Sequence, residues 1–187
     1  QEASVTATEN ALLLSATIPQ ETVIMNAACE PHIEDFANVL TKMGALIKGE
    51  GSNKITINGA DKLKGFKHRI VSDHIEAGTM AIAAASTNGT VKIEEICKDH
   101  LIMIAHHLSL MGVNFQFSGE SILEVYPSKL VSRADKVKVG LWPSFPTDLM
   151  SPFIVLATQA EGITLCHDWM YESRMFFVDK LIAMGVI

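Results

Sequence analysis

The feature that most constrains the fold of this chain is an internal repeat, marked by the dipeptide Met-Gly followed by an apolar residue. The marker glycines are Gly44, Gly112 and Gly185, which recur at intervals of 68 and 73 residues. Each glycine follows a run with apolar residues three and four positions apart, so we predict a helix that ends at a left-handed residue. A repeat of this length predicts a chain built from similar supersecondary units.

Each unit is predicted to contain a helix, a strand, a second helix and a hairpin of two strands. The first helices are expected at 11–18, 77–86 and 153–160, and the strands after them at 22–25, 90–93 and 163–166. The second helices are expected at 33–43, 101–111 and 176–184. The hairpin strands are expected at 45–48 and 54–57 in the first unit and at 113–117 and 121–125 in the second. The first helices are apolar nearly all round, which predicts burial on every side. The third unit stops at Ile187 before its hairpin, so we expect a fragment of a longer chain.

Composition excludes several classes of protein. With 48% hydrophobic and 19% charged residues, the 187-residue chain is expected to be globular. A net charge of -6 with scattered lysines provides no basic stripe, so neither nucleic acid nor a membrane surface is an expected partner. No apolar run approaches the roughly 20 residues of a membrane span, which favours a cytoplasmic protein. The cysteines are odd in number and lack metal-ligand spacing, so we expect reduced thiols, no metal and no cofactor.

Small polar or acidic residues stand where the first helix of each unit is expected to begin. Ser4, Asp73 and Asp148 lie at similar distances before the three marker glycines. Because helix N-termini attract anions, this arrangement predicts a surface that binds phosphate or diphosphate. An acid at such a position either caps its helix or acts as a base toward a bound hydroxyl. Capping is expected for Asp73, whereas the two prolines that precede Asp148 mark it as different.

Five segments together resemble the enolpyruvyl transferase family, in particular its members that act on UDP-N-acetylglucosamine. They are Ser4-Val5-Thr6-Ala7-Thr8-Glu9-Asn10, Asn26-Ala27-Ala28-Cys29-Glu30-Pro31, Asp73-His74-Ile75-Glu76-Ala77-Gly78-Thr79, Phe145-Pro146-Thr147-Asp148 and Tyr171-Glu172-Ser173-Arg174. The last two are weak signals alone and specific in combination. The resemblance covers essentially the whole chain.

The resemblance implies an α/β fold made of two inside-out α/β barrel domains. Each domain contains three β-α-β-α-β-β units with buried helices. Residues 1–69 would be the last unit of one domain, and residues 70–187 the first two units of the other, the last one truncated. Residues 65–72 would form a hinge strand between them.

The resemblance also implies a reaction. Family members of this kind transfer enolpyruvyl from phosphoenolpyruvate to the 3-hydroxyl of UDP-N-acetylglucosamine and release phosphate, in the first committed step of peptidoglycan synthesis. Asp148 matches the general base. The residues expected to bind substrate are Ser4, Val5, Thr147, Met170 and Arg174, and the acids expected to face the interdomain cleft are Glu30, Asp73 and Glu172. His32 and His74 depart from the family pattern, which alters the charge expected in the cleft.

Two alternatives remain open from the residues alone. The chain could belong to the sister transferase that uses shikimate 3-phosphate, or it could be a non-catalytic three-repeat domain that binds a phosphorylated ligand or has a structural role. The family residues that bind phosphoenolpyruvate lie outside these 187 residues, so we expect this chain to be inactive alone. Uncovered repeat faces predict pairing with further protein, including a homo-oligomer.

Overall fold

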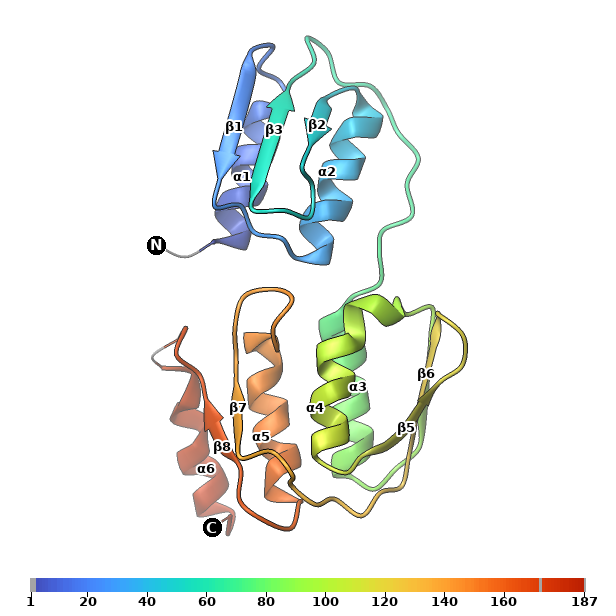
Figure 1. Cartoon of the computed structure of the whole chain (residues 1–187), viewed down its shortest axis with the longest axis vertical. Coiled ribbons are helices and arrows are strands. Elements are labelled where there is room, and N and C mark those ends of the chain that lie inside the picture. Colours follow the sequence, from blue (N-terminus) through green and yellow to red (C-terminus); the bar gives the residue numbers. More distant parts are fainter. Residues whose placement is uncertain (1–2, 172, 187) are drawn as a thin grey trace. The chain divides into compact units, whose positions relative to one another are not determined.

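The computed structural model describes residues 3–171 and 173–186, which form two compact units at 1–71 and 72–187 (Figure 1). The segment between them contains no helix or strand, so the hinge strand predicted at 65–72 is wrong. The end of this segment is hydrogen-bonded to the side chain of Asp35 and not to a strand. Asp35 accepts hydrogen bonds from Val71 N at 3.3 Å and from His68 Nε2 at 2.8 Å, which takes the place of a strand partner.

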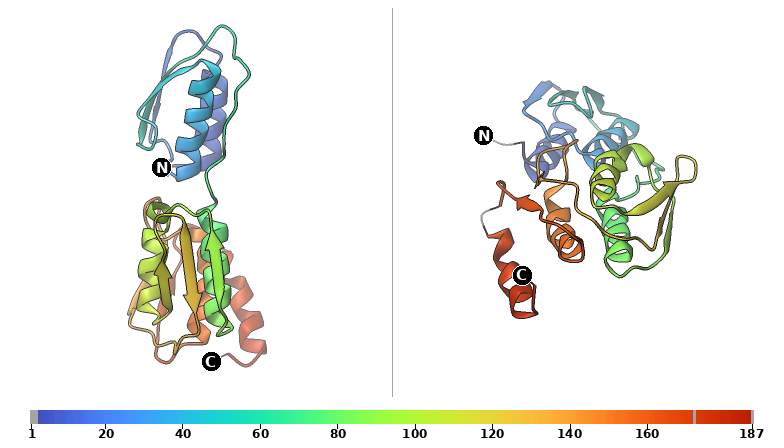
Figure 2. Two further views of the ribbon diagram at one scale, coloured as in Figure 1. Left: turned by 90° about the vertical axis from the view of Figure 1, so that its right-hand side faces the viewer. Right: turned by 60° about the horizontal axis from the view of Figure 1, so that its bottom comes forward.

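Unit 1 is a three-stranded sheet covered on one face by two helices. Its elements are α1 (Val5–Ser15), β1 (Glu21–Met25), α2 (Pro31–Met43), β2 (Leu46–Lys48) and β3 (Lys54–Asn58). The strand order is β1-β3-β2, and both pairings are antiparallel. Ile55 and Ile57 are fully buried because alternate residues of β3 point toward the helices. Figure 2 shows both helices on the same side of this sheet.

Unit 2 begins with a second copy of this arrangement. Its elements are α3 (His74–Ser86), β4 (Val91–Glu94), the 3-10 helix η1 (Lys98–Leu101), α4 (Ile102–Leu110), β5 (Asn114–Phe117) and β6 (Ile122–Tyr126). The strand order β4-β6-β5 is again antiparallel throughout, as in unit 1. The predicted repeat is therefore confirmed in topology as well as in sequence.

The third copy packs against the second within unit 2. Its elements are β7 (Lys136–Lys138), the 3-10 helix η2 (Thr147–Leu149), α5 (Met150–Thr158), β8 (Leu165–His167), the 3-10 helix η3 (Arg174–Phe177) and α6 (Val178–Ala183). Strands β7 and β8 are parallel, with Val137 opposite Cys166. Helix α5 contacts α3, and the fully buried Phe153 belongs to the core that the two copies share. This packing sets the position of the chain before and after α5.

The helix ends agree with prediction, whereas the predicted burial of the first helices does not. Gly44, Gly112 and Gly185 have φ values of 118°, 75° and 100°, which confirms the left-handed position after each second helix. Burial on every side is wrong for α1, because Leu13 and Leu14 are 53% and 67% exposed. The helices of a unit cover one face of its sheet, so their outer side meets no other element of that unit.

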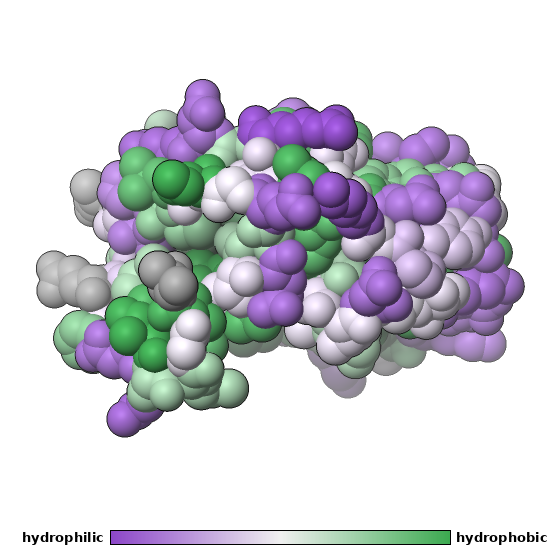
Figure 3. Space-filling view, turned by 90° about the horizontal axis from the view of Figure 1, so that it is seen from below, coloured by the Kyte–Doolittle hydropathy of each residue, from purple (hydrophilic) through white to green (hydrophobic). Residues whose placement is uncertain are grey.

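Apolar side chains are also exposed near the end of the chain. They include Ile163, Phe176, Ile182 and Met184, and Figure 3 shows apolar surface over α6 at its lower left. Phe176 lies on η3 and Ile182 on α6, whereas Ile163 and Met184 lie outside the helices and strands. No helix in the described part of the chain is long and apolar enough to cross a membrane.

Candidate functional site

Asp148 lies between two buried anchors. The ring of Phe145 is 1% exposed, and its centroid lies 4.5 Å from the ring of His107 and 5.2 Å from that of Phe153. Leu149, on the other side of Asp148, is fully buried. The Asp148 side chain itself is 62% exposed. The segment therefore presents one carboxylate to solvent from a backbone fixed on both sides.

The carboxylate of Asp148 pairs with Arg174, the first residue of η3. Arg174 Nη1 donates to Asp148 Oδ1 at 2.7 Å and to the carbonyl oxygen of Thr147 at 2.9 Å. This hydrogen bond joins Asp148 to a guanidinium and not to the N–H groups of the following helix. Asp148 is thus oriented by a side chain from 26 residues further along the chain.

Two residues of the loop after β8, Asp168 and Tyr171, lie beside the guanidinium of Arg174. Asp168 Oδ1 accepts from the backbone N–H groups of Met170 at 3.0 Å and Tyr171 at 3.2 Å, while Asp168 Oδ2 lies 3.7 Å from Arg174 Nε. The Tyr171 ring centroid lies 4.5 Å from Arg174 Cζ. We call Thr147, Asp148, Asp168, Met170, Tyr171 and Arg174 the Asp148 cluster.

The cluster places one cation between two carboxylates of unequal exposure. Asp148 is 62% exposed, the Arg174 side chain 24% and the Asp168 side chain 0%. An exposed ion pair contributes about 1 kcal/mol or less to stability, so the main effect of Arg174 on Asp148 is orientation. An exposed, oriented carboxylate can accept a hydrogen bond or a proton from a hydroxyl group.

The predicted residues of unit 1 lie at two helix N-termini. Ser4 is the N-cap of α1, and its Oγ accepts from Ala7 N at 3.2 Å. Val5 is the first residue of the same helix, whose other first-turn N–H groups have no partner within the helix. Glu30 precedes Pro31 at the start of α2 and makes no side-chain capping bond. The Glu30 side chain therefore does not cap α2.

The remaining predicted acids belong to unit 2. Asp73 caps α3, because its Oδ1 accepts from Ile75 N at 2.8 Å and from Glu76 N at 3.2 Å, which confirms the expected capping. Glu172 lies outside the described residues. His74 is 6% exposed, and its ring centroid lies 5.3 Å from that of Trp142. Its imidazole therefore packs against the segment that leads to Asp148.

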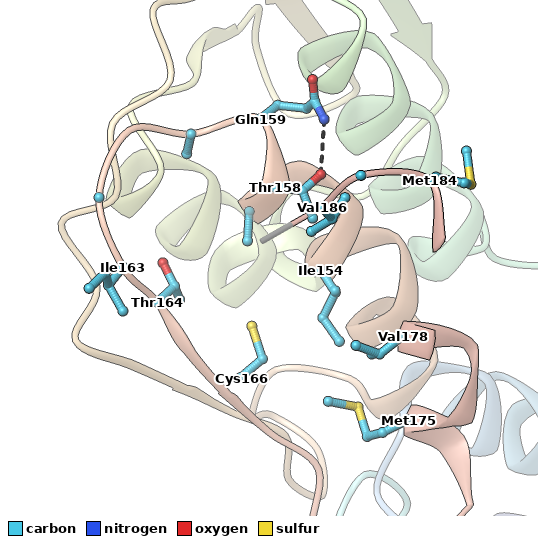
Figure 4. Close-up of a pocket in the computed structure, with 14 residues that line it drawn as sticks. Ile154, Thr158, Gln159, Ile163, Thr164, Cys166, Met175, Val178, Met184 and Val186 are labelled. Atoms are coloured by element: carbon cyan, nitrogen blue, oxygen red, sulfur yellow. Dashed lines mark hydrogen bonds between the residues drawn. The ribbon is translucent and has the colours of Figure 1, made fainter. Parts of the chain in front are cut away.

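A pocket of about 690 Å³ lies between α5, β8 and α6 (Figure 4). Most of the side chains that line it are apolar, and they include none of the residues predicted to bind substrate. Gln159 and Thr158, two of its polar side chains, bond to each other at 2.9 Å. Burial raises the pKa of Cys166, which also lines it, to about 11. The pocket offers little to recognise a diphosphate, so the Asp148 cluster is the better candidate site.

The structure brings together Thr147, Asp148, Met170 and Arg174 of the predicted residues and adds Asp168. Sequence reasoning missed Asp168. The only signal was an aspartate two residues after the strand predicted at 163–166 and two residues before Met170, a spacing typical of a side chain that accepts from the backbone ahead of it.

The chain is similar in sequence to named transferases. A family model described as EPSP synthase (3-phosphoshikimate 1-carboxyvinyltransferase) matches residues 1–187. Relatives named UDP-N-acetylglucosamine 1-carboxyvinyltransferase are 47% identical in Borrelia garinii subsp. bavariensis and 46% identical in Borreliella burgdorferi, each over 98% of this chain. The chain spans 44% of the length of each of these relatives.

Solved structures show the same fold. The enolpyruvyl transferase NikO from Streptomyces tendae matches 96% of this chain and 43% of its own, with a TM-score of 0.79 and 24% identity. An EPSP synthase from Acinetobacter baumannii matches 98% of this chain and 43% of its own, with a TM-score of 0.61 and 23% identity. The predicted α/β fold of enolpyruvyl transferase-like repeats is confirmed. The chain belongs to the EPSP synthase (3-phosphoshikimate 1-carboxyvinyltransferase) family.

Proposed function

We propose that the polypeptide that carries this chain transfers enolpyruvyl from phosphoenolpyruvate to the 3-hydroxyl of UDP-N-acetylglucosamine and releases phosphate. This would be the first committed step of peptidoglycan synthesis. The supporting observation is that relatives of this name are 46% and 47% identical over 98% of the chain. The activity is proposed for the whole polypeptide, and residues 1–187 alone are expected to be inactive.

In this proposal Asp148 is the general base. It accepts the proton of the sugar hydroxyl as the hydroxyl oxygen bonds to the enol carbon of phosphoenolpyruvate and the methylene carbon takes up a proton. The resulting tetrahedral ketal then loses a proton from that same carbon and expels phosphate, which restores the double bond. The exposure of Asp148 and its anchoring by Phe145 and Leu149 support the role, because a base must meet its proton at hydrogen-bond distance. Arg174 would hold the carboxylate in place, and Thr147 and the backbone of Met170 would contact the nucleotide sugar.

The residues of unit 1 receive a binding role. Ser4 and Val5 would contact the diphosphate, since the start of α1 has N–H groups free to bind an anion. Glu30, Asp73 and Glu172 would face the cleft between domains. We further propose that residues 1–69 complete one domain and that residues 70–187 begin the other.

The proposal is tested by phosphate release from the intact gene product, supplied with phosphoenolpyruvate and with either UDP-N-acetylglucosamine or shikimate 3-phosphate. We expect turnover with the nucleotide sugar and a loss of at least 100-fold in Asp148→Asn, in the range typical of a missing general base. Glu120→Gln is the matched control, because Glu120 is an exposed carboxylate paired with Lys98 at 3.3 Å in the same unit. It is expected to keep wild-type activity.

The description of the matching family model favours one second candidate, the transfer of enolpyruvyl to shikimate 3-phosphate. Turnover with that acceptor alone would replace our proposal. Thermal stabilisation by the nucleotide sugar without turnover in the intact product, unchanged in Asp148→Ala, would indicate a non-catalytic binding domain.

We also propose that the protein acts in the cytoplasm. We further propose that exposed apolar residues such as Leu14 and Ile163 pair with further protein, including a second copy. Light scattering of the intact gene product tests the pairing with a second copy. A monomeric mass at all concentrations would contradict the proposed homo-oligomer.

A further inference from the structure

The Asp148 cluster contains a carboxylate that has no place in the proposed reaction. Asp168 follows β8, and its side chain is fully buried, whereas Asp148 is 62% exposed. Burying a carboxylate is costly unless hydrogen bonds and an opposite charge compensate for the lost hydration. The groups around the buried carboxylate of Asp168 must therefore compensate for its lost hydration.

The two oxygens of Asp168 face different groups. Oδ1 accepts from the N–H groups of Met170 and Tyr171, which closes a turn. Oδ2 is buried without a hydrogen-bond partner among the described residues, and Arg174 Nε lies 3.7 Å away. This separation is an ion-pair distance, too long for a hydrogen bond. The charge on Oδ2 therefore acts on Arg174 electrostatically.

The carboxylates of Asp168 and Asp148 lie at different edges of the Arg174 guanidinium. Nε of Arg174 faces the buried Asp168, while Nη1 on the opposite side donates to Asp148 and to the Thr147 carbonyl. The ring of Tyr171 lies over the guanidinium carbon at 4.5 Å and limits rotation out of that plane. Because a guanidinium is planar and rigid, fixing one edge fixes the other.

We propose that Asp168 is a positioning residue that orients Arg174 and, through it, the carboxylate of Asp148. The effect on catalysis rests on the proposed function, whereas the effect on Arg174 does not. Asp168 has a second, separable role, because its Oδ1 sets the backbone of Met170, to which we assign contact with the nucleotide sugar.

Two substitutions separate these roles. Asp168→Asn keeps an oxygen that can accept from Met170 and Tyr171 and removes the charge that faces Arg174. We expect kcat to fall about 10-fold with KM for the nucleotide sugar within threefold of wild type, in line with a misplaced catalytic group. Asp168→Ala also removes the turn, so KM should rise as well. Asp135→Asn, an exposed carboxylate just before β7, is the matched control and should change neither constant.

A double variant of Asp168 and Arg174 tests whether Asp168 acts through Arg174. If Asp168 acts through Arg174, then Asp168→Asn should cause no further loss in an Arg174→Gln background. Additive losses in the double variant, or a kcat within twofold of wild type in Asp168→Asn, would overturn the proposal.

A measurement without substrate keeps this test independent of the reaction. The Nε–H signal of Arg174 in the intact gene product, identified by its absence in Arg174→Lys, should exchange with water at least fivefold faster in Asp168→Asn and at the wild-type rate in Asp135→Asn. Unchanged exchange in Asp168→Asn would refute the positioning role even if the enzyme proved inactive with both acceptors.

Discussion

Truncation of Phe145 is the sharpest test of how the segment around Asp148 is held. The ring is 1% exposed and packs against His107 and Phe153 at centroid distances of 4.5 and 5.2 Å. Phe145→Ala removes this buried ring and leaves a cavity, because the surrounding helices can collapse only in part. A fully buried phenylalanine typically contributes about 3–5 kcal/mol, and we expect a loss of that size in the free energy of unfolding.

The assay is urea unfolding of the chain, followed by tryptophan fluorescence. Both tryptophans of the chain, Trp142 and Trp169, lie in unit 2, so the signal reports this unit. Phe115→Ala is the matched control. Phe115 is half-buried on β5, with its ring centroid 6.0 Å from that of Phe117. Its removal should therefore cost roughly half as much, about 1.5–2.5 kcal/mol. Both variants replace a phenylalanine with alanine, so the difference between them reports the burial of the ring.

Loss of the Phe145 ring should also affect turnover. Without Phe145, the backbone before Asp148 loses its anchor, so turnover of the intact gene product should fall at temperatures where Phe145→Ala remains folded. Phe115→Ala should leave turnover unchanged. A loss below about 1 kcal/mol for Phe145→Ala, or equal losses in the two variants, would refute the view that this ring fixes the segment.

Two further predictions follow from buried titratable groups. Burial lowers the pKa of His107 below 6.5, so the unfolded chain takes up a proton near pH 6.5 while the native chain does not. The free energy of unfolding should therefore fall as pH drops below about 6.5, and His107→Gln should flatten that slope in urea titrations at several pH values. Burial raises the pKa of Cys166 to about 11, so its alkylation by iodoacetamide at pH 8 should be roughly 100-fold slower than that of an ordinary thiol. Peptide mass spectrometry measures this rate, and equal labelling of Cys166 in native and urea-unfolded chain would contradict it.

The sequence predicted local structure well because the repeat carries strong local signals. Apolar periodicity located the helices, and each marker glycine, such as Gly44 with a φ of 118°, ended one of them. Burial was predicted less well. Leu13 and Leu14 read as part of a helix enclosed on all sides, yet both are exposed. Periodicity identifies an apolar face but does not say which neighbouring element covers it.

The candidate site was predictable only where a short motif carries it. Asp148 and Arg174 belong to motifs, and the structure pairs them at 2.7 Å. Asp168 belongs to none of the quoted motifs. Its role depends on the burial of its side chain and on a guanidinium six residues ahead that turns back toward it, neither of which the spacing of residues in a sequence reveals.

Stability and chemistry are carried by different residues of one short segment. Phe145 and Leu149 are buried, so replacing either should cost several kcal/mol. Asp148 is 62% exposed, and its pair with Arg174 contributes about 1 kcal/mol or less to the free energy of unfolding. Under the proposed function, the carboxylate can therefore accept from a substrate hydroxyl beside Arg174 with little effect on the fold. Asp168 fits the same division in our proposal, because its buried charge would hold the guanidinium that orients Asp148.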